Sequence, residues 1–168
     1  MSRVSTQKTK TKRSRASRLL TLLSLPLLVA AVPLGPSNHA VDVGSGLSVV
    51  RAEVGYYDDA GTFVPSSRID ASKHPNFGWR LEFDGLRRQV SFREVFVLPA
   101  SAPQWQVEAD TVVAPDLASA VTRGRADVGR GRPLTHGWIS TPTDPMGPHT
   151  FRVWVDEVYV RELNFVLY

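Results

Sequence analysis

The residues best suited to binding an anion are four arginines in a short glycine-rich stretch. They are Arg123, Arg125, Arg130 and Arg132. The planar guanidinium group of arginine binds carboxylate and phosphate groups through parallel hydrogen bonds. Glycines at this density favour irregular backbone, so we expect residues 123–133 to form a loop. That loop is a candidate contact for phosphorylated lipid headgroups, polysaccharide or an acidic partner, and the alternative is a solvated loop without a ligand.

Aromatic side chains provide a second candidate contact. Trp154 is out of phase with the apolar residues of its segment, so we expect it to share the outer face of a strand with Arg152. Exposed rings stack on sugars or anchor a protein partner. Tyr56 and Tyr57 end another predicted strand and are candidates to join this surface. The alternative is that residues 99–105, or another loop, cover the Trp154 ring.

The residue types do not indicate a metal site or a reactive thiol. The chain has no cysteine, which excludes disulfides and cysteine-ligated zinc. His74, His136 and His149 stand far apart and show none of the short spacings of zinc ligands. We therefore predict neither a metal site nor a cofactor.

Carboxylates could support hydrolysis, but their pattern is weak. A glycosidase needs two carboxyl groups on either side of the bond it cleaves, and the candidates are Glu82, Asp84, Glu94 and Glu108. Glu82 falls on the polar face of its predicted strand, which favours a solvated position. No serine lies in a nucleophile motif. We predict no enzymatic activity, and a hydrolase with dispersed catalytic residues remains the alternative.

The elements that must position these residues are β-strands. In residues 77–83 four large apolar side chains alternate with Gly78, Arg80 and Glu82, which places them on one face. The remaining predicted strands are 47–57, 90–98, 105–109, 135–140, 150–155 and 158–168, with a tight turn at residues 156–157. Alternation changes phase within 90–98, indicating either a β-bulge near Arg93 or burial of both faces.

This pattern predicts an all-β domain. About seven or eight short strands and no sustained helical period favour an antiparallel β-sandwich. A small barrel is the alternative, because alternation alone does not show whether a sheet closes on itself.

The first 40 residues have the composition of an export signal and a short linker. Seven Lys/Arg lie in the first 18 residues, no acidic residue precedes Asp42, and an apolar run follows at residues 19–35. The run is shorter than a membrane-spanning helix needs. We expect residues 1–40 to direct the chain to the periplasm or the cell exterior, and residues 41–168 to form the domain. Membrane contact is expected only through this segment, if it stays uncleaved.

The leader also hides the charge of the domain. The whole chain carries a net charge of +4, yet seven of its 20 basic residues lie in the leader. The remainder has 13 basic and 16 acidic residues. A mildly negative domain has no overall attraction for nucleic acid, so we predict no nucleic-acid partner.

Several segments recur in an order seen in a known group of domains. They are Phe77–Leu81, Val97–Pro99, Gly137–Trp138, Phe151–Val155 and Leu163–Val166. In this order the chain, over about residues 47–168, resembles bacterial periplasmic immunoglobulin-like domains of unknown function. The resemblance implies an immunoglobulin-like β-sandwich and a cell-envelope location, and it implies no chemistry.

We therefore expect an exported, non-enzymatic binding or interaction module of the cell envelope. Its partner would be an unknown protein or glycan. A carbohydrate-binding module that uses Trp154, Tyr56 and Tyr57 is an alternative from the same residues.

Overall fold

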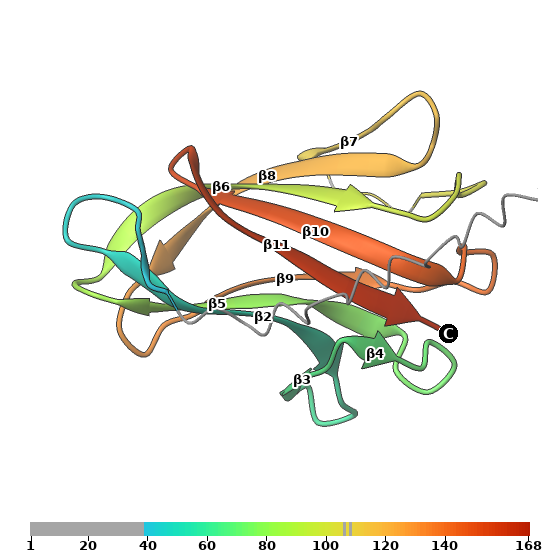
Figure 1. Ribbon diagram of the computed structural model, residues 1–168, viewed down its shortest axis with the longest axis horizontal. Helices are drawn as coiled ribbons and strands as arrows, with labels where there is room; N and C mark the ends of the chain where they lie inside the picture. Colours follow the sequence, from blue (N-terminus) through green and yellow to red (C-terminus); the bar gives the residue numbers. More distant parts are fainter. Residues whose placement is uncertain (1–38, 106, 108) are drawn as a thin grey trace, which may run out of the picture. The chain divides into compact units, whose positions relative to one another are not determined.

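Two β-sheets packed face to face make up the computed structural model of this protein (Figure 1). The structure describes residues 39–105, 107 and 109–168, so the predicted signal segment up to residue 38 lies outside the described residues. None of the described residues belongs to a helix that could cross a membrane. The strands are β1 (Val41–Asp42), β2 (Ser48–Tyr57), β3 (Phe63–Pro65), β4 (Arg68–Ile69), β5 (Asn76–Asp84), β6 (Arg88–Val97), β7 (Thr111–Val113), β8 (Ser119–Val128), β9 (Leu134–Ile139), β10 (Gly147–Val155) and β11 (Val158–Leu167).

The strand order confirms the predicted sandwich. One sheet has the order β1-β2-β5-β9, with β3 paired to β2, and the other has the order β4-β11-β10-β6-β8-β7. In Figure 1, β2, β5 and β9 form one layer and β6, β8 and β10 the other. The chain enters the second sheet briefly at β4 and returns at β5. It changes sheet again between β5 and β6, between β8 and β9, and between β9 and β10. This is an immunoglobulin-like arrangement, and no pairing among the described strands joins the two sheets into a barrel.

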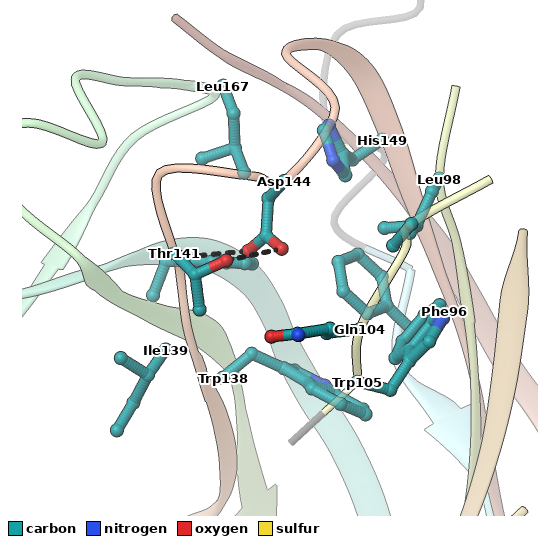
Figure 2. A pocket seen from close by; sticks show the side chains of 12 residues that line it. Phe96, Leu98, Gln104, Trp105, Trp138, Ile139, Thr141, Asp144, His149 and Leu167 are labelled. Atoms are coloured by element: carbon teal, nitrogen blue, oxygen red, sulfur yellow. Dashed lines mark hydrogen bonds between the residues drawn. The ribbon is translucent and has the colours of Figure 1, made fainter. Parts of the chain in front are cut away.

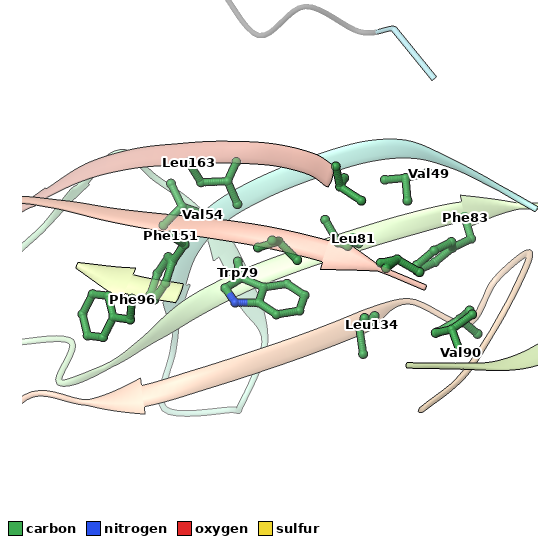
Figure 3. Close-up of a cluster of buried hydrophobic side chains, with 14 of the residues drawn as sticks. Val49, Val54, Trp79, Leu81, Phe83, Val90, Phe96, Leu134, Phe151 and Leu163 are labelled. Atoms are coloured by element: carbon green, nitrogen blue, oxygen red, sulfur yellow. The ribbon is translucent and has the colours of Figure 1, made fainter. Parts of the chain in front are cut away.

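The core lies between the two sheets and follows the predicted alternation. Phe77, Trp79, Leu81 and Phe83 of β5 are all buried, and Trp79 has no exposed surface. They meet buried side chains of the opposite sheet, including Phe151, as Figure 3 shows. Each such side chain stabilises the fold by about 1.5–3 kcal/mol relative to an exposed position. The face opposite the core is left free for contacts outside the domain.

Strand β8 corrects the loop predicted at residues 123–133. It runs to Val128, so Arg123 and Arg125 lie on a strand, and only the residues after it turn back. Gly124 does not break the strand because the Phe92 ring takes the room of the missing side chain. A Cβ at Gly124 would lie 2.5 Å from Cε1 of Phe92. The glycine is there for packing, which a composition argument does not reveal.

Strand β6 corrects the predicted change of phase. Its register with β8 and β10 continues without a bulge, so Glu94 lies on the same inner face as Val90 and Phe96. Val95, on the outer face, is half-buried beneath neighbouring side chains. The bulge proposed near Arg93 is wrong, and a carboxylate occupies the inner position.

The hairpin between β10 and β11 is as tight as the sequence predicts. Asp156 and Glu157 form its turn with φ angles of 46° and 65°. Two successive positive φ angles are typical of the type I′ turn, whose twist matches that of the paired strands. The Asp156 carboxylate also accepts hydrogen bonds from the backbone N–H of Ser91, at 2.8 Å, and from Nη1 of Arg88, at 2.5 Å. These bonds fix the turn against β6.

Candidate functional site

The structure separates the four arginines that the sequence grouped. Arg123 and Arg125 project from the outer face of β8, both exposed. Arg130 lies in the following turn, where its Nη2 is 2.6 Å from an oxygen of Asp84. Arg132 approaches Asp127 at 3.9 Å. Only the first two arginines are therefore available as a joint anion contact.

A third arginine, outside the set predicted from the sequence, completes this surface. Arg93 of β6 lies directly opposite Arg123 in the sheet, and its neighbour Ser91 lies opposite Arg125. Side chains directly opposite on neighbouring strands are about 5 Å apart at Cβ, and like charges there repel. Among the described residues, no carboxylate oxygen lies within 4.0 Å of Arg93, Arg123 or Arg125.

Trp154 borders these arginines on the same outer face. The guanidinium carbon of Arg93 is 3.9 Å from the centroid of the Trp154 ring, within the range of a cation–π contact. Tyr159, which is about half exposed, lies 5.2 Å from the Trp154 ring between centroids. Trp154 is half-buried, and both of these side chains contact its ring. We call Arg93, Arg123, Arg125, Trp154 and Tyr159 the basic face.

Arg152 shares the outer face with Trp154, as predicted, but its guanidinium group is already paired with a carboxylate. Its Nε donates a hydrogen bond to Glu162 at 2.9 Å. This bond and the negative charge of Glu162 raise the pKa of Arg152, and the same bond lowers the pKa of Glu162. The pair is neutral and adds no net charge to the basic face.

Tyr56 and Tyr57 lie on the other sheet, away from Trp154. The Tyr56 ring packs against the core and stacks on His74 at 3.9 Å between centroids. Tyr57 points the opposite way and lies over Gly137, whose Cβ would be 3.4 Å from its ring. Burial raises the pKa of Tyr57, against a hydrogen bond with Thr135 that lowers it. The structure does not bring these tyrosines into one surface with Trp154.

A buried carboxylate lies between the sheets. Glu94 has no exposed surface, and two tryptophan N–H groups and one histidine nitrogen of the opposite sheet converge on it. Trp79 Nε1 donates to Oε2 at 2.5 Å, and Trp138 Nε1 donates to Oε1 at 2.7 Å. His136 Nδ1 lies 2.7 Å from Oε2 and completes the set. The carboxyl oxygens of Glu94 accept from both indole N–H groups, so neither buried tryptophan donor is left without a partner. We call these four residues the Glu94 network.

The acidic candidates for hydrolysis do not meet. Glu82 lies on the outer face of the five-stranded sheet and pairs with Arg80 at 2.9 Å. Asp84 pairs with Arg130, and Glu108 lies outside the described residues. Glu94 is held in the Glu94 network on the inner side of the other sheet. In the described part of the chain, no three metal-ligating side chains gather into a group.

Comparisons with known proteins identify a family and two structural neighbours. A family model described as PM0630 beta sandwich domain matches residues 50–168. An immunoglobulin-like protein from Pseudomonas aeruginosa aligns with 13% identity and a TM-score of 0.47, over 76% of this chain and 100% of its own. The alkylpurine DNA glycosylase AlkC of Pseudomonas fluorescens, solved bound to DNA with an abasic site analog, aligns with 13% identity and a TM-score of 0.34. That alignment covers 69% of this chain and 30% of the glycosylase. No curated protein matches the chain.

Proposed function

The chain belongs to the PM0630 beta sandwich domain family, and on that premise we propose that it is a non-enzymatic binding module exported to the cell envelope. A sandwich fold alone does not define a function, so the proposal depends on the site that the fold carries. That site is the basic face.

The observation that supports the proposal is that the arginines of the basic face have no carboxylate partner among the described residues. Arg130 and Arg152 each pair closely with a carboxylate. Arg93, Arg123 and Arg125 form no such pair among the described residues, although their strands place them side by side. Like charges in this position cost stability unless an anion bridges them. An anionic ligand would relieve the repulsion, which gives the face a preference for negatively charged partners.

The ligand class that fits best is a carboxylated polysaccharide. The guanidinium fork binds a carboxylate with two hydrogen bonds. Trp154 and Tyr159 place two aromatic rings beside the arginines, and aromatic rings with one polar end are frequent anchors at binding surfaces. The outer face of a sheet suits an extended chain of repeated acidic units, because each arginine can meet a separate carboxylate.

The test is binding of residues 41–168 to polygalacturonate, with neutral dextran as the reference, measured by isothermal titration calorimetry at two salt concentrations. We expect binding to the acidic polymer only, weakened by salt because the contact is electrostatic. Arg93→Gln and Arg123→Gln should each weaken it at least tenfold. Arg130→Gln is the matched control, because its partner is Asp84, and should leave binding within twofold. Equal binding to dextran, or an equal loss in all three variants, would contradict the proposal.

Export is the second part of the proposal and needs its own test. The basic, acid-free start and the apolar run that follows it support an address outside the cytoplasm. We expect a tagged full-length chain to fractionate with periplasmic or secreted proteins, and a chain starting at residue 41 to remain in the cytoplasm. Retention of the full-length chain in the cytoplasm would refute export without affecting the ligand test.

The Glu94 network favours one second candidate, a hydrolase. A histidine bonded to a buried carboxylate is a common catalytic pair. Here the carboxylate also serves two tryptophans, which indicates a structural role. We expect no hydrolysis of nitrophenyl esters or glycosides above the buffer rate. Hydrolysis that disappears in His136→Gln, with the fold retained, would establish the hydrolase instead.

A further inference from the structure

A small cavity at one end of the sandwich is separate from the basic face. Its volume is about 30 Å³, more than the roughly 10–15 Å³ that a single enclosed water needs. Phe96, Trp105 and Trp138 form aromatic walls, and the exposed residues Gln104 and Ile139 stand at its rim. Figure 2 shows Asp144 and His149 on one side of the cavity and Trp105 and Trp138 on the other.

His149 brings an unused hydrogen-bond acceptor to this cavity. Its side chain is 1% exposed, and its Nδ1 lies 2.9 Å from the carbonyl oxygen of Gly147. A carbonyl only accepts, so Nδ1 carries the proton and Nε2 carries a lone pair. Nε2 is buried and has no hydrogen-bond partner. Burial lowers the pKa of His149, which keeps the ring neutral and the lone pair available near pH 7.

Asp144 brings negative charge to the same space. One of its oxygens accepts from the backbone N–H of Thr141 at 2.8 Å, and the other accepts from the Thr141 hydroxyl at 2.9 Å. Each carboxylate oxygen can accept a second bond. Figure 2 shows the carboxyl group directed toward the centre of the cavity. The bonds to Thr141 hold it in that orientation.

We propose that this cavity binds a primary ammonium group at the end of an alkyl chain. Three features select that group together. An ammonium has three N–H donors; the Asp144 carboxylate lines the cavity as an acceptor, and the unpartnered Nε2 lone pair is buried in His149, a residue of the cavity wall. Aromatic walls attract a cation through the negative faces of their rings. The volume admits one ammonium head, while the alkyl stem passes out between Gln104 and Ile139.

A primary alkylammonium group can come from two sources, a free alkylamine or a lysine side chain of another protein. The test uses n-butylammonium and Nα-acetyl-lysine amide, with 1-butanol as the uncharged control. The readout is the indole N–H resonances of the four tryptophans in an ¹⁵N-labelled domain. We expect both amines to shift Trp105 and Trp138 saturably and to leave Trp154 unchanged. Tighter binding of the lysine derivative assigns the site to a protein lysine, and equal binding assigns it to a free amine.

Two variants make the test decisive. Asp144→Asn keeps the size and one oxygen acceptor but removes the charge, so it should weaken n-butylammonium at least tenfold. Asp116→Asn is the matched control, because Asp116 is exposed and does not line the cavity, and it should bind normally. An unchanged Trp79 resonance shows that each variant keeps its core. No shift with either amine, an equal shift with 1-butanol, or unchanged binding in Asp144→Asn would overturn the proposal.

Discussion

At the scale of single residues, Glu94 shows how a carboxyl group can be accommodated in a hydrophobic core. Moving a carboxylate out of water is costly unless hydrogen bonds replace its hydration. The Glu94 carboxyl group accepts a hydrogen bond from each of two tryptophans, and its Oε2 lies 2.7 Å from Nδ1 of His136. All three partners belong to β5 and β9 of the opposite sheet. The network therefore specifies how the two sheets align, in addition to filling space.

Changing Glu94 to glutamine should destabilise the domain severely. The glutamine amide places an NH₂ donor where an oxygen now accepts, so at least one tryptophan N–H loses its partner. We expect the free energy of unfolding to fall by about 2–4 kcal/mol, as measured by urea denaturation. Glu82→Gln, at a partly exposed ion pair, is the control and should cost less than about 0.5 kcal/mol. Equal losses would show that the network contributes nothing special.

His149 should make stability depend on pH in a defined direction. Its pKa is lowered from the ordinary value of 6.5 because burial disfavours the charged ring. The unfolded chain therefore binds a proton at a pH where the folded chain does not, which favours unfolding. We expect the free energy of unfolding to decrease as the pH falls from 7 through 6.5 toward the lowered pKa that His149 has in the folded chain. His149→Phe should flatten this slope, and an unchanged slope would refute the assignment.

At the scale of elements, the β10–β11 hairpin depends on one carboxylate. Burial raises the pKa of Asp156, but the bonds from Arg88 and Ser91 outweigh that effect, and the net pKa lies below 3.8. Asp156 thus stabilises the fold fully above pH 3.8, and its contribution is lost as the pH falls through the folded pKa. Asp156→Asn tolerates the same positive φ but lacks the charge.

We therefore expect Asp156→Asn to lower the thermal midpoint at pH 7 and to differ less from the natural chain near pH 2. Circular dichroism melts across this range provide the measurement. Asp59→Asn, at an exposed turn position, should match the natural chain at every pH. A constant difference between Asp156→Asn and the natural chain would mean that the charge is irrelevant to the hairpin.

The pairing of β5 with β9 depends on the missing side chain of Gly78. A Cβ there would lie 2.1 Å from the carbonyl oxygen of His136, which belongs to the neighbouring strand. Gly78→Ala must push β9 away and should cost at least about 2 kcal/mol. Gly137→Ala is the comparison variant. Its Cβ would come no closer than 3.4 Å to a neighbouring atom, so the loss of stability should be smaller. Urea denaturation should rank the two clearly, and similar costs would contradict the argument.

Strand alternation predicted most elements because their inner faces are continuous. The segment Phe77–Phe83 became β5, and the predicted 158–168 became β11, since large apolar residues recur at every second position. The same rule could have found Glu94, which shares its phase with Phe92 and Phe96. A charged residue in that phase was instead interpreted as a disturbance of the strand. Its partners come from β5 and β9, and such long-range hydrogen bonds leave no local pattern.

The candidate site was harder to predict for a related reason. Arg123 and Arg125 were selected for their type, but Arg93 was not, because it joins them only through the register of β6 and β8. The cavity depends on His149 and Asp144 together with Trp105 from a distant loop. Neither the three arginines nor the cavity residues follow a regular spacing in the sequence. Residue type indicated the chemistry, and strand pairing decided which residues meet.

At the scale of the whole molecule, the two proposed sites differ in charge and in position. The basic face lies on the outer surface of one sheet, whereas the cavity opens at the end of the sandwich between the sheets. No residue belongs to both sites. Binding at one should not change affinity at the other, because coupling needs a shared element with two arrangements.

Thermal stabilisation by the two ligands should therefore be additive. A ligand that binds only the folded chain raises the unfolding midpoint according to its concentration and affinity. We expect n-butylammonium and polygalacturonate together to raise it by the sum of their separate effects, as measured by differential scanning calorimetry. A combined shift well above or below the sum would reveal coupling between the two sites.

The parallel pairing of β4 with β11 has a consequence for how the polypeptide acquires its structure. Val166 pairs with Arg68, so a contact that closes one sheet joins segments about a hundred positions apart, a separation typical of slow-folding topologies. While the ribosome is still making the last strands, β4 lacks its partner β11, and the six-stranded sheet stays incomplete. Removal of the final ten residues should therefore leave a chain that proteases degrade rather than a weakened domain.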